Sequence, residues 1–188
     1  MISVQQLMTI DGLPVHPLVV HAVVVLLPLS AVGVVLIALR PPWRRRYGAP
    51  VAVLAVLSVA AVPVAQQTGE QLKARLDATQ NPLINQHAEL GGTLLPYAIV
   101  FGVLAVALVL IGPVADRRRL VPESAAPESA APEGGVPEQG PAGGRGPLRV
   151  LVVVIAALAV LSAVATTAQV IRIGHSGSEA VWEGIGTS

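Results

Sequence analysis

The chain has 188 residues, of which 53% are hydrophobic and only 12% are charged, and its mean hydropathy is +0.70. Soluble domains carry about 25% charged residues, so the composition predicts a membrane protein. Cysteine is absent, which excludes disulfides, thiolate metal sites and cysteine-held iron–sulfur clusters in this chain. The net charge is +1, and no block of basic and aromatic residues suits a nucleic acid, so no nucleic-acid partner is expected.

Four apolar stretches are each long enough to cross a bilayer, which takes about 20 residues of helix. They run over residues 18–39, 50–70, 90–114 and 150–173. The first three contain an internal proline, which is tolerated at such depth when neighbouring helices cover the freed backbone groups. The sequence therefore predicts an all-α fold, a packed four-helix transmembrane bundle.

The same pattern divides the chain into three parts. Residues 1–114 hold the first three helices, residues 115–148 form a linker, and residues 149–188 hold the fourth helix and a C-terminal tail. The linker is rich in Pro, Ala, Glu and Gly, a composition that cannot bury a core and predicts disorder. We interpret it as a tether, in preference to a docking segment for a partner.

The basic residues predict the orientation in the membrane, because cytoplasmic loops carry an excess of Lys and Arg. One side of the predicted bundle carries nine of them, and the other side carries Lys73, Arg75 and Arg172. The abundance of Arg, Ala and Val favours a bacterial source. We therefore expect a multi-pass protein of the bacterial inner membrane, with both termini outside. The nine are Arg40, Arg44, Arg45, Arg46, Arg117, Arg118, Arg119, Arg145 and Arg149.

The four histidines of the chain are all expected at the outer end of the bundle. His16 and His21 lie at the start of the first span, His87 lies at the start of the third, and His175 follows the fourth. The end of the second span brings Glu70 to the same level. Gly174 resembles a helix stop, so we expect His175 to fold back over this rim from a turn.

Imidazoles and a carboxylate together suit a transition metal such as Zn, Cu or Fe, and imidazoles alone suit the axial positions of haem b. The metal hypothesis uses His16, His21, Glu70, His87 and His175, with His16 as a capping or supporting residue. The haem hypothesis uses His21, His87 and His175. Titratable groups at this depth also fit a proton path, and a single interfacial histidine is more often a solvated or capping residue.

Four segments of the chain, read together, resemble a known family. They are "GLPVHPLVVH", "QQTGE", "NQHAELGG" and "IRIGHSG", and their order over four spans is similar to that in the DUF2231 family of bacterial four-helix membrane proteins. The opening histidine–proline segment is the most specific of them. In that family the domain also occurs beside Rieske-type iron–sulfur domains, which implies a redox context for some members.

The sequence thus predicts an outward-facing His/Glu site in an integral membrane protein. We interpret the chain as a metal- or haem-binding subunit linked to electron transfer. Its expected partners are the lipid bilayer and a redox protein or membrane complex. The alternative is a non-catalytic structural or accessory subunit of a larger membrane complex. No nucleophile motif is present, so the chain is not expected to be an enzyme by itself. The inner halves of the spans are almost purely apolar, which counts against a pore.

Overall fold

The computed structural model describes residues 9–10, 13–75, 80–118 and 146–182. Within these ranges the chain forms four long helices, preceded by an antiparallel pair of two-residue strands in which Thr9 pairs with Pro14. The predicted four-helix fold is therefore confirmed. The elements are β1 (Thr9–Ile10), β2 (Leu13–Pro14), α1 (Val15–Leu39), α2 (Pro41–Arg75), α3 (Pro82–Arg118) and α4 (Pro147–Trp182).

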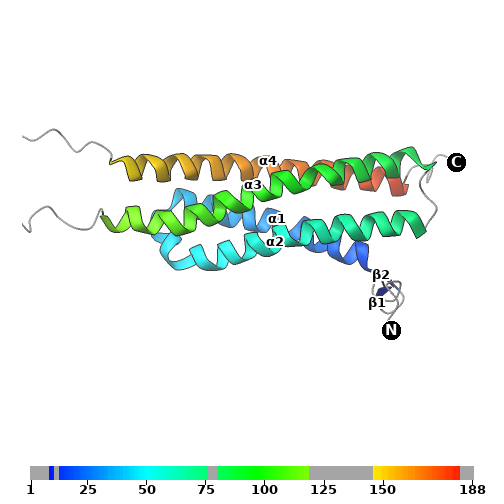
Figure 1. Ribbon diagram of the computed structural model, residues 1–188, viewed down its shortest axis with the longest axis horizontal. Helices are drawn as coiled ribbons and strands as arrows, with labels where there is room; N and C mark the ends of the chain where they lie inside the picture. The colour runs from blue at the N-terminus through cyan, green and yellow to red at the C-terminus, as the bar shows by residue number, and fades with distance from the viewer. Residues whose placement is uncertain (1–8, 11–12, 76–79, 119–145, 183–188) are drawn as a thin grey trace, which may run out of the picture.

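All four helices are long and apolar enough to cross a membrane. They pack in the ring order α1, α2, α3, α4, with α4 returning to α1. As a result α1 lies diagonally across the bundle from α3, and α2 lies diagonally across from α4. The start of α1, the end of α2, the start of α3 and the end of α4 all lie at one end of the molecule, on the right of Figure 1.

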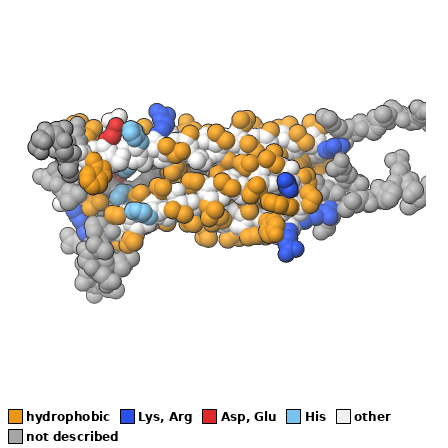
Figure 2. All heavy atoms as spheres, turned by 180° about the vertical axis from the view of Figure 1, so that it is seen from behind, with side chains coloured by type: hydrophobic (Ala, Val, Ile, Leu, Met, Phe, Trp, Pro, Cys, Tyr) orange, Lys and Arg blue, Asp and Glu red, His pale blue; other side chains and the backbone are white. Residues whose placement is uncertain are grey.

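The core is built from small and medium side chains with Phe101 as its largest fully buried member. Alanines such as Ala55, Ala105 and Ala159 are completely buried, which lets the helix axes approach closely, as is typical of helices in lipid. Large apolar side chains such as Leu110 and Leu161 point outward instead. Figure 2 shows this apolar surface along the bundle, which is the surface that a bilayer requires.

Several boundaries differ from the sequence expectation because hydropathy marks the extent of the membrane and not the end of a helix. Positions 115–118 and 147–148, expected in the linker, are helical, and the remaining linker residues 119–145 lie outside the described residues. Only Arg40 separates α1 from α2, so the arginine-rich connection is itself helical from Pro41.

The expectation that the fourth helix stops at Gly174 is wrong, since α4 continues to Trp182. Glycine inside a helix costs only about 1 kcal/mol, so a single glycine does not have to end a helix that packs against its neighbours. Ser176 and Ser178 donate to the carbonyls three residues earlier, at 2.9 and 2.7 Å. His175 therefore lies on the surface of a continuous helix and does not fold back over the rim.

Candidate functional site

A cavity of about 570 Å³ lies between the helices at the end where α1 begins and α4 ends. Figure 2 shows a hollow there beside histidine side chains. All four helices contribute to its wall, which is mostly aliphatic, with residues such as Val23, Val62, Leu94 and Val170. The side chains in the wall that carry polar groups are His16, Gln66, Glu70, Lys73 and His87.

His16 enters the cavity from the first turn of α1, where Pro17 is favoured because its missing N–H has no helical partner to lose. The Nδ1–H of the ring donates to the carbonyl of Ala65 at 3.1 Å and to Thr68 Oγ1 at 3.2 Å. A carbonyl can only accept, so the proton is on Nδ1. In the neutral ring Nε2 then carries the lone pair.

The neighbouring residue on α2 is a glycine for a steric reason. A Cβ at Gly69 would stand 2.9 Å from Cε1 of His16, which is closer than carbon atoms approach. The imidazole of His16 thus lies directly over the backbone of α2.

His87 is held in the same way by α3 and α4. Asn81 starts α3 by accepting from the backbone N–H of Leu83 at 2.9 Å, a typical N-cap that is followed by a proline. The Nδ1 of His87 lies 3.1 Å from Ser176 Oγ, and that hydroxyl donates its proton to a backbone carbonyl of α4. Ser176 therefore accepts from His87, which again leaves the lone pair on Nε2.

The two histidines are held by the same local arrangement, a hydroxyl residue followed by a glycine on the neighbouring helix. A Cβ at Gly177 would stand 2.9 Å from Cε1 of His87, and a Cβ at Gly69 would stand at the same distance from Cε1 of His16. Each helical hairpin thus places a histidine near its start against a hydroxyl–glycine pair near its end, Thr68-Gly69 in one and Ser176-Gly177 in the other. The two histidines stand on diagonally opposite helices and line the same cavity.

The structure brings together His16, Glu70 and His87 from the predicted set and leaves two members outside the cavity wall. His21 is exposed, and its Nδ1 donates to the carbonyl of Pro17 at 2.6 Å. His175 is exposed on α4, where its Nε2 lies 3.2 Å from Glu179. His16 and His21 are five positions apart, which turns them about 140° from each other on a helix.

Further polar contacts fix α3 against its neighbours around the cavity. Gln66 of α2 lines the cavity and donates through Nε2 to the carbonyl of Gly91 at 2.9 Å. On the other side of α3, Gln169 donates through Nε2 to Thr93 Oγ1 at 2.6 Å. These bonds tie α3 to α2 and to α4, and so help to set the rotation of α3 and with it the direction of His87.

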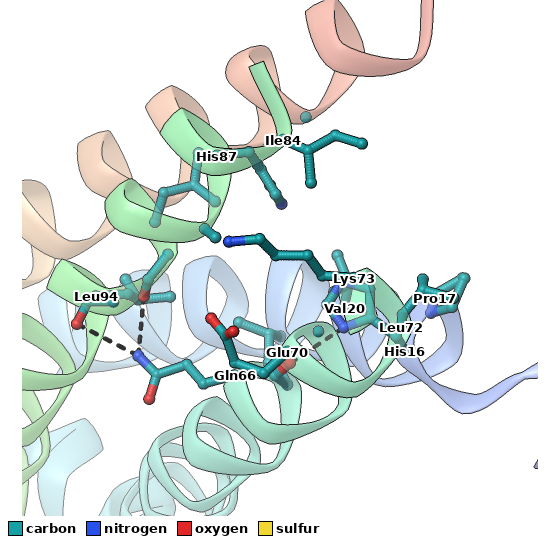
Figure 3. A pocket seen from close by; sticks show the side chains of 18 of the residues that line it. His16, Pro17, Val20, Gln66, Glu70, Leu72, Lys73, Ile84, His87 and Leu94 are labelled. Carbon is teal, nitrogen blue, oxygen red and sulfur yellow. Dashed lines mark hydrogen bonds between the residues drawn. The ribbon is translucent and has the colours of Figure 1, made fainter. Parts of the chain in front are cut away.

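Lys73 and Glu70 lie on successive turns of α2 at the cavity. Figure 3 shows Lys73 extending from α2 towards α3, with the ring of His87 above it. The carboxylate of Glu70 points into the same space (Figure 3). The cavity wall thus carries one cation and one anion beside the two imidazoles.

Sequence reasoning missed Lys73, Ser176 and both contact glycines as parts of this site. A search for internal repeats would have found a signal, since a hydroxyl–glycine pair occurs near the end of both the second and the fourth span, in "QQTGE" and "IGHSGS". The pairing of each with a histidine needs the fold, because 52 residues separate His16 from Thr68 and 89 separate His87 from Ser176.

A family model described as "Predicted membrane protein (DUF2231)" matches residues 12–188. The chain belongs to the DUF2231 family. No curated protein and no solved structure matches it. The four sequence segments that resemble DUF2231 all contribute to the cavity wall, through residues such as Pro17, Gly69, Ala88 and Ile173.

The nitrogen ligands that the cavity of this DUF2231 protein offers are two imidazoles, each with its lone pair on Nε2, and Glu70 is the one carboxylate in the described part of the cavity wall. Among the described residues, no three His, Cys, Asp or Glu side chains are grouped so that they could hold a metal ion. A zinc site needs three or four protein ligands. The geometry thus favours a bound group that takes two imidazoles and brings its remaining ligands itself.

Proposed function

We propose that this integral membrane protein binds a b-type haem, with His16 and His87 as the axial ligands, and serves electron transfer. The observation that supports this most directly is the shared cavity of two histidines on diagonally opposite helices. A porphyrin supplies four nitrogen ligands to its iron, so the protein needs to add only two. Cofactor sites in helix bundles are built in this way, from side chains on facing helices.

The hydrogen bonds at Nδ1 support the same proposal. Histidines that bind a metal through one nitrogen nearly always donate the other N–H to a carbonyl, carboxylate or water, which fixes the ring. His16 donates to the carbonyl of Ala65, and His87 donates to the hydroxyl of Ser176. In both rings the orientation is therefore set by the protein before any ligand arrives.

The cavity also has the polarity and size that a largely apolar ligand requires. Its volume of about 570 Å³ falls within the range of about 300–1,000 Å³ that is usual for small-molecule sites. Its wall is aliphatic apart from a few polar groups. Lys73 supplies a cation for the carboxylate groups of haem. Bound haem would supply a one-electron redox centre.

The proposal departs from the sequence expectation in one respect. His21 and His175 were expected among the ligands, but both are exposed and neither lines the cavity. His16, expected as a capping or supporting residue of the metal set, lines the cavity. We further propose that the cavity faces the outside of a bacterial inner membrane, because the basic residues concentrate at the other end.

The experiment is an absorption spectrum of the full chain, purified in detergent from cells supplied with a haem precursor. The unmodified protein is expected to show a low-spin b-type spectrum. The variants His16→Ala and His87→Ala should each lower haem occupancy by at least about ten-fold. His21→Ala and His175→Ala are matched controls that should retain the spectrum.

Two results would contradict the proposal. A colourless protein that also fails to take up added haem would favour the alternative of an accessory membrane subunit. A coloured protein whose spectrum is lost in His21→Ala and kept in His16→Ala would move the ligands away from the cavity.

A further inference from the structure

A second cavity, of about 510 Å³, lies at the opposite end of the bundle. The end of α1, the start of α2, the end of α3 and the start of α4 form its wall. Of the eleven residues that line it, two are arginines, Arg44 and Arg149, and none is acidic. The remaining nine are apolar or glycine, among them Ala38, Leu148 and Val152.

Arg44 is built into the protein from α2. Its side chain is only 3% exposed, and its Nε donates to the carbonyl of Ile37 in the last turns of α1 at 3.3 Å. The side chain lies directly on the backbone of Gly112 in α3 and occupies the place where a Cβ would stand. The position of the guanidinium is thus fixed by three helices.

Arg149 stands at the start of α4 and is exposed. Along the same helix the wall of the cavity continues through Val152, Val153 and Ala156. The groove is therefore cationic at its mouth and aliphatic further along α4. Guanidinium groups recognise phosphate oxygens through paired hydrogen bonds, so this pattern matches a molecule that has a phosphate at one end and a hydrocarbon chain at the other.

Aromatic contacts place the mouth of the groove at the depth of lipid head groups. The guanidinium of Arg40 lies 5.2 Å from the ring centre of Trp43, and that of Arg46 lies 5.7 Å from the ring centre of Tyr47. Tyrosine and tryptophan collect at the boundary between membrane and water. Trp43 and Tyr47 are on the same turns of α2 as Arg44.

We propose that this groove binds an anionic phospholipid, with its phosphate at the exposed Arg149, near the buried positive charge of Arg44, and an acyl chain along Val152, Val153 and Ala156. A free phosphate ion would gain nothing from the aliphatic wall, whereas a lipid uses both parts. Basic pockets between transmembrane helices on the cytoplasmic side are known to suit anionic lipid head groups. The inference is independent of the proposed haem site.

The test measures thermal unfolding of the full chain in detergent with added lipid. Phosphatidylglycerol is expected to raise the unfolding temperature in a saturable way, whereas phosphatidylcholine with the same acyl chains and glycerol phosphate alone are not. Because Arg44 is buried and its removal could prevent folding, the variant is Arg149→Gln, which should weaken the lipid effect by about ten-fold. The matched control is Arg45→Gln, an exposed arginine outside the cavity wall.

Three results would overturn the proposal. Equal stabilisation by phosphatidylcholine would show that the groove does not distinguish an anionic head group from a zwitterionic one. Equal stabilisation by glycerol phosphate would indicate a free anion site. Equal weakening in Arg149→Gln and Arg45→Gln would reduce the effect to general attraction between the basic end of the protein and an anionic surface.

Discussion

Gly69 and His16 are in such close contact that the glycine cannot carry a side chain without moving the imidazole. A Cβ there would stand 2.9 Å from Cε1 of the ring. The contact joins α2 to the first turn of α1 and so determines where the histidine lies in the cavity.

The first prediction concerns this contact. Relative to Gly91→Ala, Gly69→Ala should lower the free energy of unfolding by about 1–3 kcal/mol, the usual cost of overpacking, because either the ring or the helix must shift. The control is Gly91→Ala, a helical glycine of the same cavity wall where a Cβ would meet nothing within 4 Å. Reversible unfolding in mixed detergent measures both variants. Equal stability of the two variants would mean that the contact places no constraint on the helices.

The second prediction concerns the hydrogen bonds that orient the two imidazoles. Ser176→Ala removes the hydroxyl that accepts from His87, and we expect haem affinity to fall about ten-fold. Thr68→Val should have a smaller effect, because His16 keeps the carbonyl of Ala65 as an acceptor. Haem titration followed by absorbance gives both affinities.

The matched control for this pair is Ser178→Ala. Ser178 is exposed, and its hydroxyl donates to the carbonyl of His175 on its own helix, so its loss should leave haem affinity unchanged. A larger effect from Thr68→Val than from Ser176→Ala would contradict the assignment of the two acceptors.

The third prediction concerns the hydrogen bond between Gln169 and Thr93, which joins α4 to α3. Gln169 is buried, and hydrogen bonds between membrane helices contribute about 0.6 kcal/mol on average and up to about 1.7 kcal/mol. A double-mutant cycle of Gln169→Leu and Thr93→Val should give a coupling energy in this range. The exposed Gln67 supplies a control that should show no coupling to Thr93.

The fourth prediction concerns orientation and uses the absence of cysteine from the chain. Single cysteines at Ser178 and Arg45 are placed at exposed positions near opposite ends of the bundle. In intact cells a membrane-impermeant maleimide should label Ser178→Cys and should label Arg45→Cys only after the cells are permeabilised. The reverse pattern would place the cavity in the cytoplasm.

The fold could be predicted from the sequence, whereas the inward face of each helix could not. Four long apolar stretches indicate four membrane helices almost directly. However, α1 is apolar on every side, with the exposed Leu29 and Val32 as hydrophobic as the buried Leu27 and Val34. Periodicity therefore gives no sign that His16 faces the cavity and that His21 does not.

Contacts between residues far apart in the sequence could not be predicted either. Arg44 lies in a run of arginines that composition assigns to a solvated loop, yet it is buried against Gly112 because α2 begins at once after α1. The single residue between those helices leaves no room for a loop, and this follows from packing, which a hydropathy pattern does not report.

Both hairpins hold a histidine against a hydroxyl–glycine pair, and this has a consequence for the symmetry of the molecule. Each hairpin crosses the bilayer twice, so both begin from the same side, and the repeat that relates them is parallel with its axis along the membrane normal. The cavity that His16 and His87 line is bounded by both hairpins. A flat molecule bound between the two hairpins would meet an imidazole on each of its two faces, and each imidazole would be supported from behind by a hydroxyl and by the backbone at a glycine.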